Sequence, residues 1–177
     1  MSWNPPLAPA RVVWHAIFAH LSIAFLTGAV VMTSPAWSEP AKPVTAAKVL
    51  RLAGLATPTA VLIQIALGAL YRHQITGVMP HMLGAMLVAL LALLVSVTLI
   101  QNFPEHQPLK RAATLLISMV LAQVCLGVAV FVMLLLGAGN TAAFTWTATG
   151  HVTVGTLAFA ASMLMAMQVE RNVHANS

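Results

Sequence analysis

The chain has very few charged residues and almost no acids. Only 6% of its 177 residues are charged, aspartate is absent, and the three acids are Glu39, Glu105 and Glu170. About a quarter of the residues in an ordinary soluble domain are charged, whereas 60% of this chain is hydrophobic. A soluble core of this length could not bury so much apolar surface. The composition therefore predicts a protein embedded in a lipid bilayer.

Other scarcities exclude further classes of protein. Cys125 is the only cysteine, which rules out an intrachain disulfide. The formal net charge of +5 reflects missing acids, and the bases do not cluster as nucleic-acid binding requires. No acid lies within an apolar run, so a proton relay of carboxylates inside the membrane is excluded. Residues 1–10 lack the features of a signal peptide, so we interpret the first apolar run as a retained helix.

Five apolar stretches are long enough to cross a bilayer, which takes about 20 residues each. The predicted spans are Val12–Thr33, Leu55–Arg72, Pro80–Ile100, Arg111–Leu136 and Thr149–Gln168. The expected fold is all-α and polytopic. Residues 55–177 are predicted to form a four-helix transmembrane bundle, and residues 1–54 one extra N-terminal transmembrane helix with a cytoplasmic linker.

The distribution of bases predicts the orientation. Five spans would place six of the eight Lys and Arg residues on one side and two, Arg11 and Arg72, on the other. Basic loops favour the cytoplasm. The prediction is a plasma-membrane protein, such as one of a bacterial inner membrane, with its N-terminus outside and its C-terminus in the cytoplasm. Aromatic residues near the span ends are predicted to anchor the helices at the interfaces: Trp14, Trp37, Tyr71 and Trp146.

Two helix pairs share a sequence pattern. Residues 64–68 and 123–127 both read Gln-x-x-Leu-Gly, and each is followed by a predicted helix that opens with histidine. These histidines are His81 and His151, and each has a glycine one turn later, Gly84 or Gly155. The pattern indicates an internal repeat. Chance similarity between Leu- and Ala-rich helices remains the alternative explanation.

Most of the histidines fall at the predicted outer ends of the helices. They are His15, His20, His73, His81 and His151, whereas His106 and His174 fall in predicted solvated segments and are interpreted as incidental. Neutral imidazole binds haem iron well, and helical bundles build cofactor sites from ligands on facing helices. His81 and His151 are therefore the candidate axial ligands. Zinc is less favoured because no carboxylate or thiolate lies near.

The neighbouring residues suggest how a porphyrin would be accommodated. A glycine at i+3 or i+4 lies on the same helix face as the histidine, so Gly84 and Gly155 are predicted to leave flat space beside the rings. Close helix packing is the competing use of these glycines. Arg72, beside His73, is predicted either to reach the lipid headgroups or to pair with haem propionates.

The helix pairs of residues 55–168, including the Tyr71-Arg72-His73 end of the second span, resemble one half of haem A synthase, a family that assists assembly of haem-copper oxidases. Its long members contain two four-helix bundles, and single-bundle members exist. The resemblance implies a short single-bundle form with haem held by His81 and His151. The haem would be haem b, or haem O or haem A. The first span resembles the last helix of a preceding bundle, which makes His15 and His20 lesser candidates.

The chain departs from the family pattern at the catalytic position. Family helices with a ligand histidine commonly read Glu-x-x-His-Arg, whereas this chain has Val78-Met79-Pro80-His81-Met82, and the family's outer-loop cysteine pair is missing. Haem binding needs neither feature, but methyl-group oxidation needs a means of handling protons. Three functions remain open: a haem A synthase-like oxidoreductase, a b-type cytochrome or respiratory-complex subunit, and a cofactor-free membrane subunit. One bundle offers one haem site, so electron transfer between two haems would need a second copy of the chain, in a homo-oligomer, or a partner such as a respiratory oxidase component.

Overall fold

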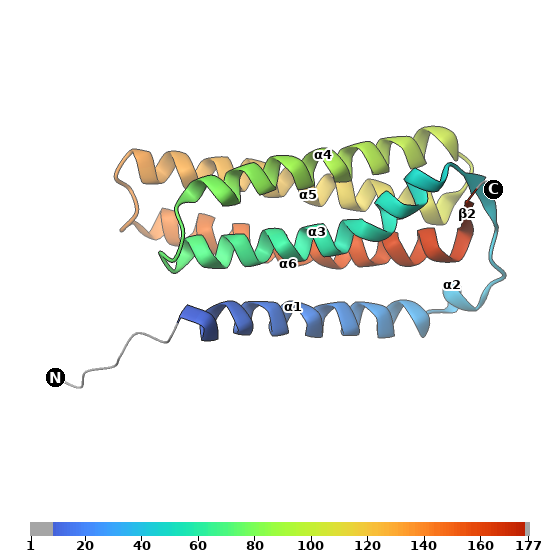
Figure 1. Ribbon diagram of the computed structural model, residues 1–177, viewed down its shortest axis with the longest axis horizontal. Coiled ribbons are helices and arrows are strands. Elements are labelled where there is room, and N and C mark those ends of the chain that lie inside the picture. The colour runs from blue at the N-terminus through green and yellow to red at the C-terminus, as the bar shows by residue number, and fades with distance from the viewer. Residues whose placement is uncertain (1–8, 176–177) are drawn as a thin grey trace.

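The computed structural model describes residues 9–175, apart from the side chains of residues 9, 10 and 12. It is an all-α bundle with five helices long and apolar enough to cross a membrane (Figure 1). The long helices are α1 (Pro9–Met32), α3 (Lys48–Arg72), α4 (Val78–Asn102), α5 (Gln107–Leu135) and α6 (Ala142–Asn172). A short helix α2 (Pro35–Ser38) and strands β1 (Val44–Ala46) and β2 (Val173–Ala175) complete the described chain. The five-span prediction is confirmed.

Four of the long helices form a closed antiparallel bundle. α3 packs on α4, α4 on α5, α5 on α6 and α6 on α3, so α4 and α6 occupy diagonally opposite positions. Helix α1 lies outside this bundle against α3 and α6 (Figure 1). In hydrocarbon every backbone polar group must be satisfied within the protein, which is why these apolar runs form uninterrupted helices.

The predicted helix bounds need correction at two places. α3 begins at Lys48, not Leu55, so Pro58 lies inside the helix and not in its first turn. A proline there removes one helical hydrogen bond, and Figure 1 shows the first part of α3 running obliquely before it joins the bundle. α6 begins at Ala142, not Thr149, so His151 lies well inside the helix rather than at its start.

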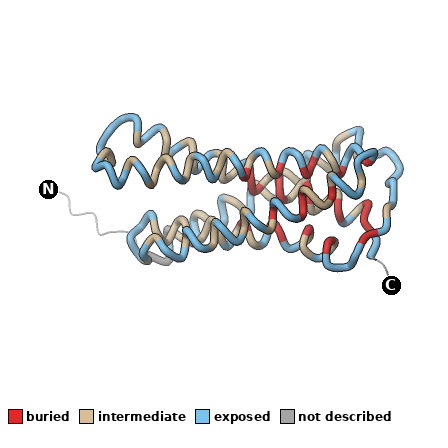
Figure 2. The backbone as a smooth tube through the Cα atoms, turned by 90° about the horizontal axis from the view of Figure 1, so that it is seen from above, coloured by how far each residue is buried: buried red, intermediate tan, exposed pale blue. Residues whose placement is uncertain are grey.

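The hydrophobic core occupies only one half of the bundle. The fully buried side chains gather towards the end that carries β1 and β2, as Figure 2 shows. They include Ala92, Val95 and Leu99 of α4, Leu109, Ala113 and Leu116 of α5, and Ala161, Met165 and Val169 of α6. No residue in 62–91 or 121–157 is fully buried. The helices are therefore packed tightly at one end and loosely at the other.

The core end is closed by contacts between segments that are distant in sequence. β1 pairs with β2 in parallel, with Val44 opposite Val173. Arg51 donates to the Val173 carbonyl at 3.0 Å and forms an ion pair with Glu170 at 2.5 Å. These contacts connect the linker between α2 and α3 (residues 39–47) and the first turn of α3 to the end of α6.

His106 belongs to this closure, which corrects its interpretation as a solvated and incidental residue. It is only 7% exposed. Its Nε2 donates to the Lys42 carbonyl at 2.9 Å, and its Nδ1 accepts from the Leu109 amide at 3.3 Å. His106 therefore caps α5 and holds the linker. Sequence reasoning missed this role because it depends on a partner 64 residues away.

Candidate functional site

His81 lies in the first turn of α4 and is held by Gln64 of α3. The Gln64 side-chain nitrogen lies 2.8 Å from His81 Nδ1 and donates to the His81 carbonyl, also at 2.8 Å. Tyr71 stacks on the imidazole with ring centroids 6.3 Å apart and planes 12° apart. Tyr71, predicted as an interfacial anchor, therefore also helps to orient His81.

His151 of α6 has the equivalent partner on α5. The Gln123 side-chain nitrogen lies 3.2 Å from His151 Nε2. The two pairs form although Gln64 and His81 are 17 residues apart and Gln123 and His151 are 28 apart. The second hairpin is longer, yet the same two residue types meet. The repeat seen in the sequence is therefore also a repeat of contacts.

The glycines of the repeat fit the histidines and glutamines together. A Cβ on Gly68 would lie 2.9 Å from Cε1 of His81, and one on Gly127 would lie 3.1 Å from Cε1 of His151. The glycine of each Gln-x-x-Leu-Gly segment thus makes room for an imidazole, because a methyl group at these distances would displace the ring. Sequence reasoning noted both glycines as part of the repeat but assigned them no role.

Gly84 and Gly155 make room for the glutamines instead. A Cβ on Gly84 would collide with the Gln64 side chain, and one on Gly155 would lie 3.0 Å from the Gln123 side-chain nitrogen. The expectation of empty space for a porphyrin beside Gly84 and Gly155 is wrong, because the glutamine side chains occupy the space next to both glycines. They favour the site indirectly, by letting each glutamine approach its histidine.

The two histidines face each other across the bundle. Their ring centroids are 6.4 Å apart and their planes are perpendicular. They come from α4 and α6, the diagonally opposite helices, and they lie in the half where no residue is fully buried. The structure therefore brings together the two residues that the sequence singled out, at the loosely packed end.

Several polar atoms at this position have no partner. Gln64 Oε1, Gln123 Oε1 and His151 Nδ1 are buried and form no hydrogen bond with any residue in 9–175. An unpaired buried polar atom is costly and commonly marks a missing ligand, ion or water. No group of three or more His, Cys, Asp or Glu side chains comes together within the described residues. A metal at this site would therefore have two imidazole ligands from the chain.

The spacing of the rings fits one metal ion between them. An imidazole nitrogen binds a transition metal at about 2.0–2.1 Å, so two rings that share an ion have centroids roughly 6 Å apart. Each ring also uses one nitrogen for its glutamine, Nδ1 in His81 and Nε2 in His151, and keeps the other available. The donor set, the spacing and the unpaired atoms are compatible with a bis-histidine haem.

The other predicted site residues lie outside this cluster. Arg72 and His73 are exposed at the end of α3, next to Tyr71, and His15 is exposed on α1. His20 attaches α1 to α6. Its Nδ1 donates to the Ala16 carbonyl at 2.7 Å, its Nε2 accepts from the Thr156 hydroxyl at 3.3 Å, and its ring meets Phe159 edge-on. His20 therefore has a packing role in this structure.

The fold and the site together define a class: an integral membrane protein with a two-histidine site inside a four-helix bundle. No protein-family model, curated protein or solved structure matches the chain.

Proposed function

We propose that this chain is a haem-binding membrane protein in which His81 and His151 are the axial ligands of one haem. The main support is that the two imidazoles face each other at 6.4 Å in the loosely packed half of the bundle. Because both imidazoles come from one chain, a single copy of the protein supplies both ligands to the haem iron. Bound haem would supply one-electron redox chemistry.

The glutamines orient the ligands and control their protons. Gln64 donates to His81 Nδ1, so the neutral ring carries its proton on Nε2. Ligation through Nε2 needs the opposite tautomer. This tautomer, with the proton on Nδ1, forms if the Gln64 amide rotates so that its unpaired Oε1 accepts from Nδ1–H. Such an outer partner sets the tautomer and basicity of a ligand histidine. Gln123 donates to Nε2 of His151 instead, so that ring carries its proton on Nδ1, and ligation through Nδ1 needs the same rotation of the Gln123 amide.

The surroundings favour holding haem over oxidising it. All three acids lie at the core end, away from the histidines: the Glu39 main-chain carbonyl accepts from Arg171, the Glu170 carboxylate pairs with Arg51, and Glu105 precedes His106. No carboxylate handles protons beside the two imidazoles. The chain therefore supports a b-type cytochrome or haem-holding factor best. A haem A synthase-like oxidoreductase acting on haem O is the second candidate, supported by the repeated Gln-His pattern.

The distribution of basic residues supports one orientation of the chain across the membrane. The core end carries the α1–α3 connection with the start of α3, the α4–α5 connection with the start of α5, and the end of α6. Six of the eight bases lie there, so we place this end in the cytoplasm. The haem site then lies in the outer half of a plasma membrane, with Arg72 at the outer surface, where it can pair with propionates. One chain holds one haem, so electron transfer needs a second copy or a respiratory oxidase component.

Absorption spectroscopy tests the proposal. The full chain, expressed with ample haem and purified in detergent, should show a Soret band and a low-spin bis-imidazole spectrum. Pyridine haemochrome analysis identifies the haem as b, O or A, and co-expression with a haem O source tests for oxidation to haem A. A colourless protein under these conditions would leave only a cofactor-free membrane subunit.

A further inference from the structure

An apolar groove runs along the outside of the bundle, away from the histidines. It has a volume of about 540 Å³ and lies between α1 and α5 over α6, which is within the usual range of small-molecule sites. Its walls include Leu26 and Val30 of α1 and Met119 of α5, and Ala160 and Ala161 of α6 line its floor. The small floor residues leave a channel about two helical turns long, open to the membrane.

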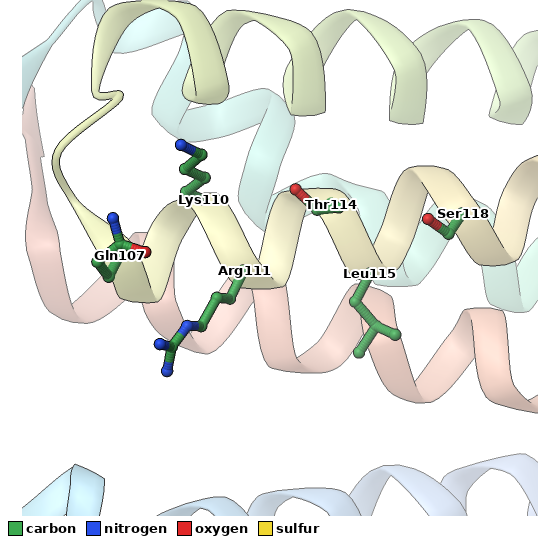
Figure 3. A pocket seen from close by; sticks show the side chains of 6 residues that line it. All are labelled: Gln107, Lys110, Arg111, Thr114, Leu115 and Ser118. Carbon is green, nitrogen blue, oxygen red and sulfur yellow. The ribbon is translucent and has the colours of Figure 1, made fainter.

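A polar hollow adjoins this groove at the beginning of α5. It has a volume of about 390 Å³ and is lined by Gln107, Lys110, Arg111, Thr114, Leu115 and Ser118 (Figure 3). Leu115 lines both the hollow and the groove. Figure 3 shows Arg111 and Leu115, one turn apart, extending from the same side of α5. The polar hollow and the apolar groove therefore meet at Leu115.

The charge of the hollow is uncompensated. Arg51 pairs with Glu170, and Arg171 lies over the Trp37 ring at 4.4 Å. Within residues 9–175, by contrast, neither Lys110 nor Arg111 forms an ion pair. Both lie in the first turns of α5, where the helix dipole adds positive potential. Hydroxyls of Thr114 and Ser118 provide additional hydrogen-bonding groups. This combination suits a phosphate.

We propose that the hollow and the groove form one binding site for an anionic phospholipid. Arg111, which extends to the same side of α5 as Leu115, binds its phosphate, and Lys110 on the other side of the helix adds positive charge. An acyl chain lies in the groove between α1 and α5. Basic pockets at the membrane surface bind anionic headgroups in this manner. A free phosphate would use only the hollow. In a zwitterionic lipid the choline cation offsets the phosphate charge beside the two bases, whereas an anionic lipid satisfies both the hollow and the groove. The lipid would fill the space between α1 and the bundle, supplementing the His20–Thr156 contact.

Native mass spectrometry of the full chain in detergent tests this site. We expect dioleoyl phosphatidylglycerol to bind more tightly than dioleoyl phosphatidylcholine, which has the same tails. A cation close to a bound anionic headgroup contributes about fivefold to its binding, so Lys110→Gln with Arg111→Gln should weaken phosphatidylglycerol binding by about tenfold or more. The matched control, Lys42→Gln with Lys48→Gln, removes the same charge at the same end and should leave binding unchanged.

A second variant tests the groove separately from the hollow. Ala160→Phe fills the floor and should reduce lipid binding while Lys110 and Arg111 remain. Equal binding of the two lipids, equal losses in the two charge variants, or competition by soluble glycerol phosphate would overturn the proposal. A dimer in the wild-type protein that Ala160→Phe dissociates would show that a second copy occupies the groove, which also overturns it. None of these results depends on haem.

Discussion

The imidazole rings of His81 and His151 stand perpendicular to each other, 6.4 Å apart, on helices that lie diagonally across the bundle. Neither ring is free to turn, because each is engaged by a glutamine from the preceding helix and lies close to a glycine one turn beyond that glutamine. The same two contacts, one with a glutamine and one with a glycine, therefore form in both helical hairpins, although the hairpins differ in length. This arrangement leads to predictions about ligands, their partners and the glycines.

Replacing either histidine should abolish the low-spin haem spectrum. His81→Ala and His151→Ala each remove one of the two axial imidazoles, and a single remaining ligand gives a high-spin or haem-free protein. Absorption and electron paramagnetic resonance spectra of the purified variants measure this. His174→Ala is the matched control, since His174 is an exposed histidine at the opposite end. A normal bis-imidazole spectrum in both site variants would refute the assignment.

Removing the glutamines should weaken haem binding without removing a ligand. Gln64→Leu and Gln123→Leu retain side-chain size but leave the histidine nitrogens without their partners. Loss of such an outer partner typically lowers metal affinity by about 10- to 100-fold. Haem titration gives the affinity, and a shift in reduction potential would report the altered ligand basicity. Gln101→Leu, at an exposed glutamine of α4, should change neither quantity. Unaltered affinity and potential in both site variants would contradict the positioning role.

Adding a methyl group at the repeat glycines should displace the rings. A Cβ at position 68 would lie 2.9 Å from Cε1 of His81, and one at position 127 would lie 3.1 Å from Cε1 of His151. Gly68→Ala and Gly127→Ala should each lower haem affinity by about tenfold or more, since such overpacking typically costs about 1–3 kcal/mol. Gly28→Ala on α1 is the control, because a Cβ there meets nothing within 4 Å. If all three variants bind haem equally well, the glycines do not position the ligands.

His106 should matter for stability and not for the haem. His106→Ala removes a buried bond to the Lys42 carbonyl and the acceptor for the Leu109 amide. We expect a loss of about 1–3 kcal/mol in the free energy of unfolding, measured in mixed micelles, with an unchanged haem spectrum. His174→Ala should stay within about 0.5 kcal/mol of the wild type. A stable His106→Ala protein would mean that β1, β2 and Arg51 suffice to hold the linker.

The ion pair at the same end should contribute much less. Arg51 and Glu170 are 2.5 Å apart, but the Glu170 side chain is 60% exposed. Exposed ion pairs typically contribute about 0–1 kcal/mol. Glu170→Gln should therefore lower the free energy of unfolding by less than His106→Ala does, and high salt should reduce the difference further. A larger loss than that of His106→Ala would show that Arg51 depends on Glu170 to hold the Val173 carbonyl.

Sequence reasoning could identify the spans and the two histidines because both depend on local patterns. An apolar run such as 80–100 must form a helix in lipid whatever it packs against. The repeat of Gln-x-x-Leu-Gly and histidine marked His81 and His151 without any knowledge of their distance. It could not assign Gly84 to Gln64 or Gly68 to His81, because that choice depends on how α3 rotates against α4.

The amino-acid sequence by itself therefore determined that this is a helical membrane protein with five spans, since hydrocarbon forces each apolar segment to satisfy its own backbone. Only the tertiary structure decided that His81 and His151 meet, that His106 is buried and that His20 faces α6. Those outcomes arise from contacts between segments distant in the chain. Their geometry depends on helix rotation and packing depth, which no local pattern of residues specifies.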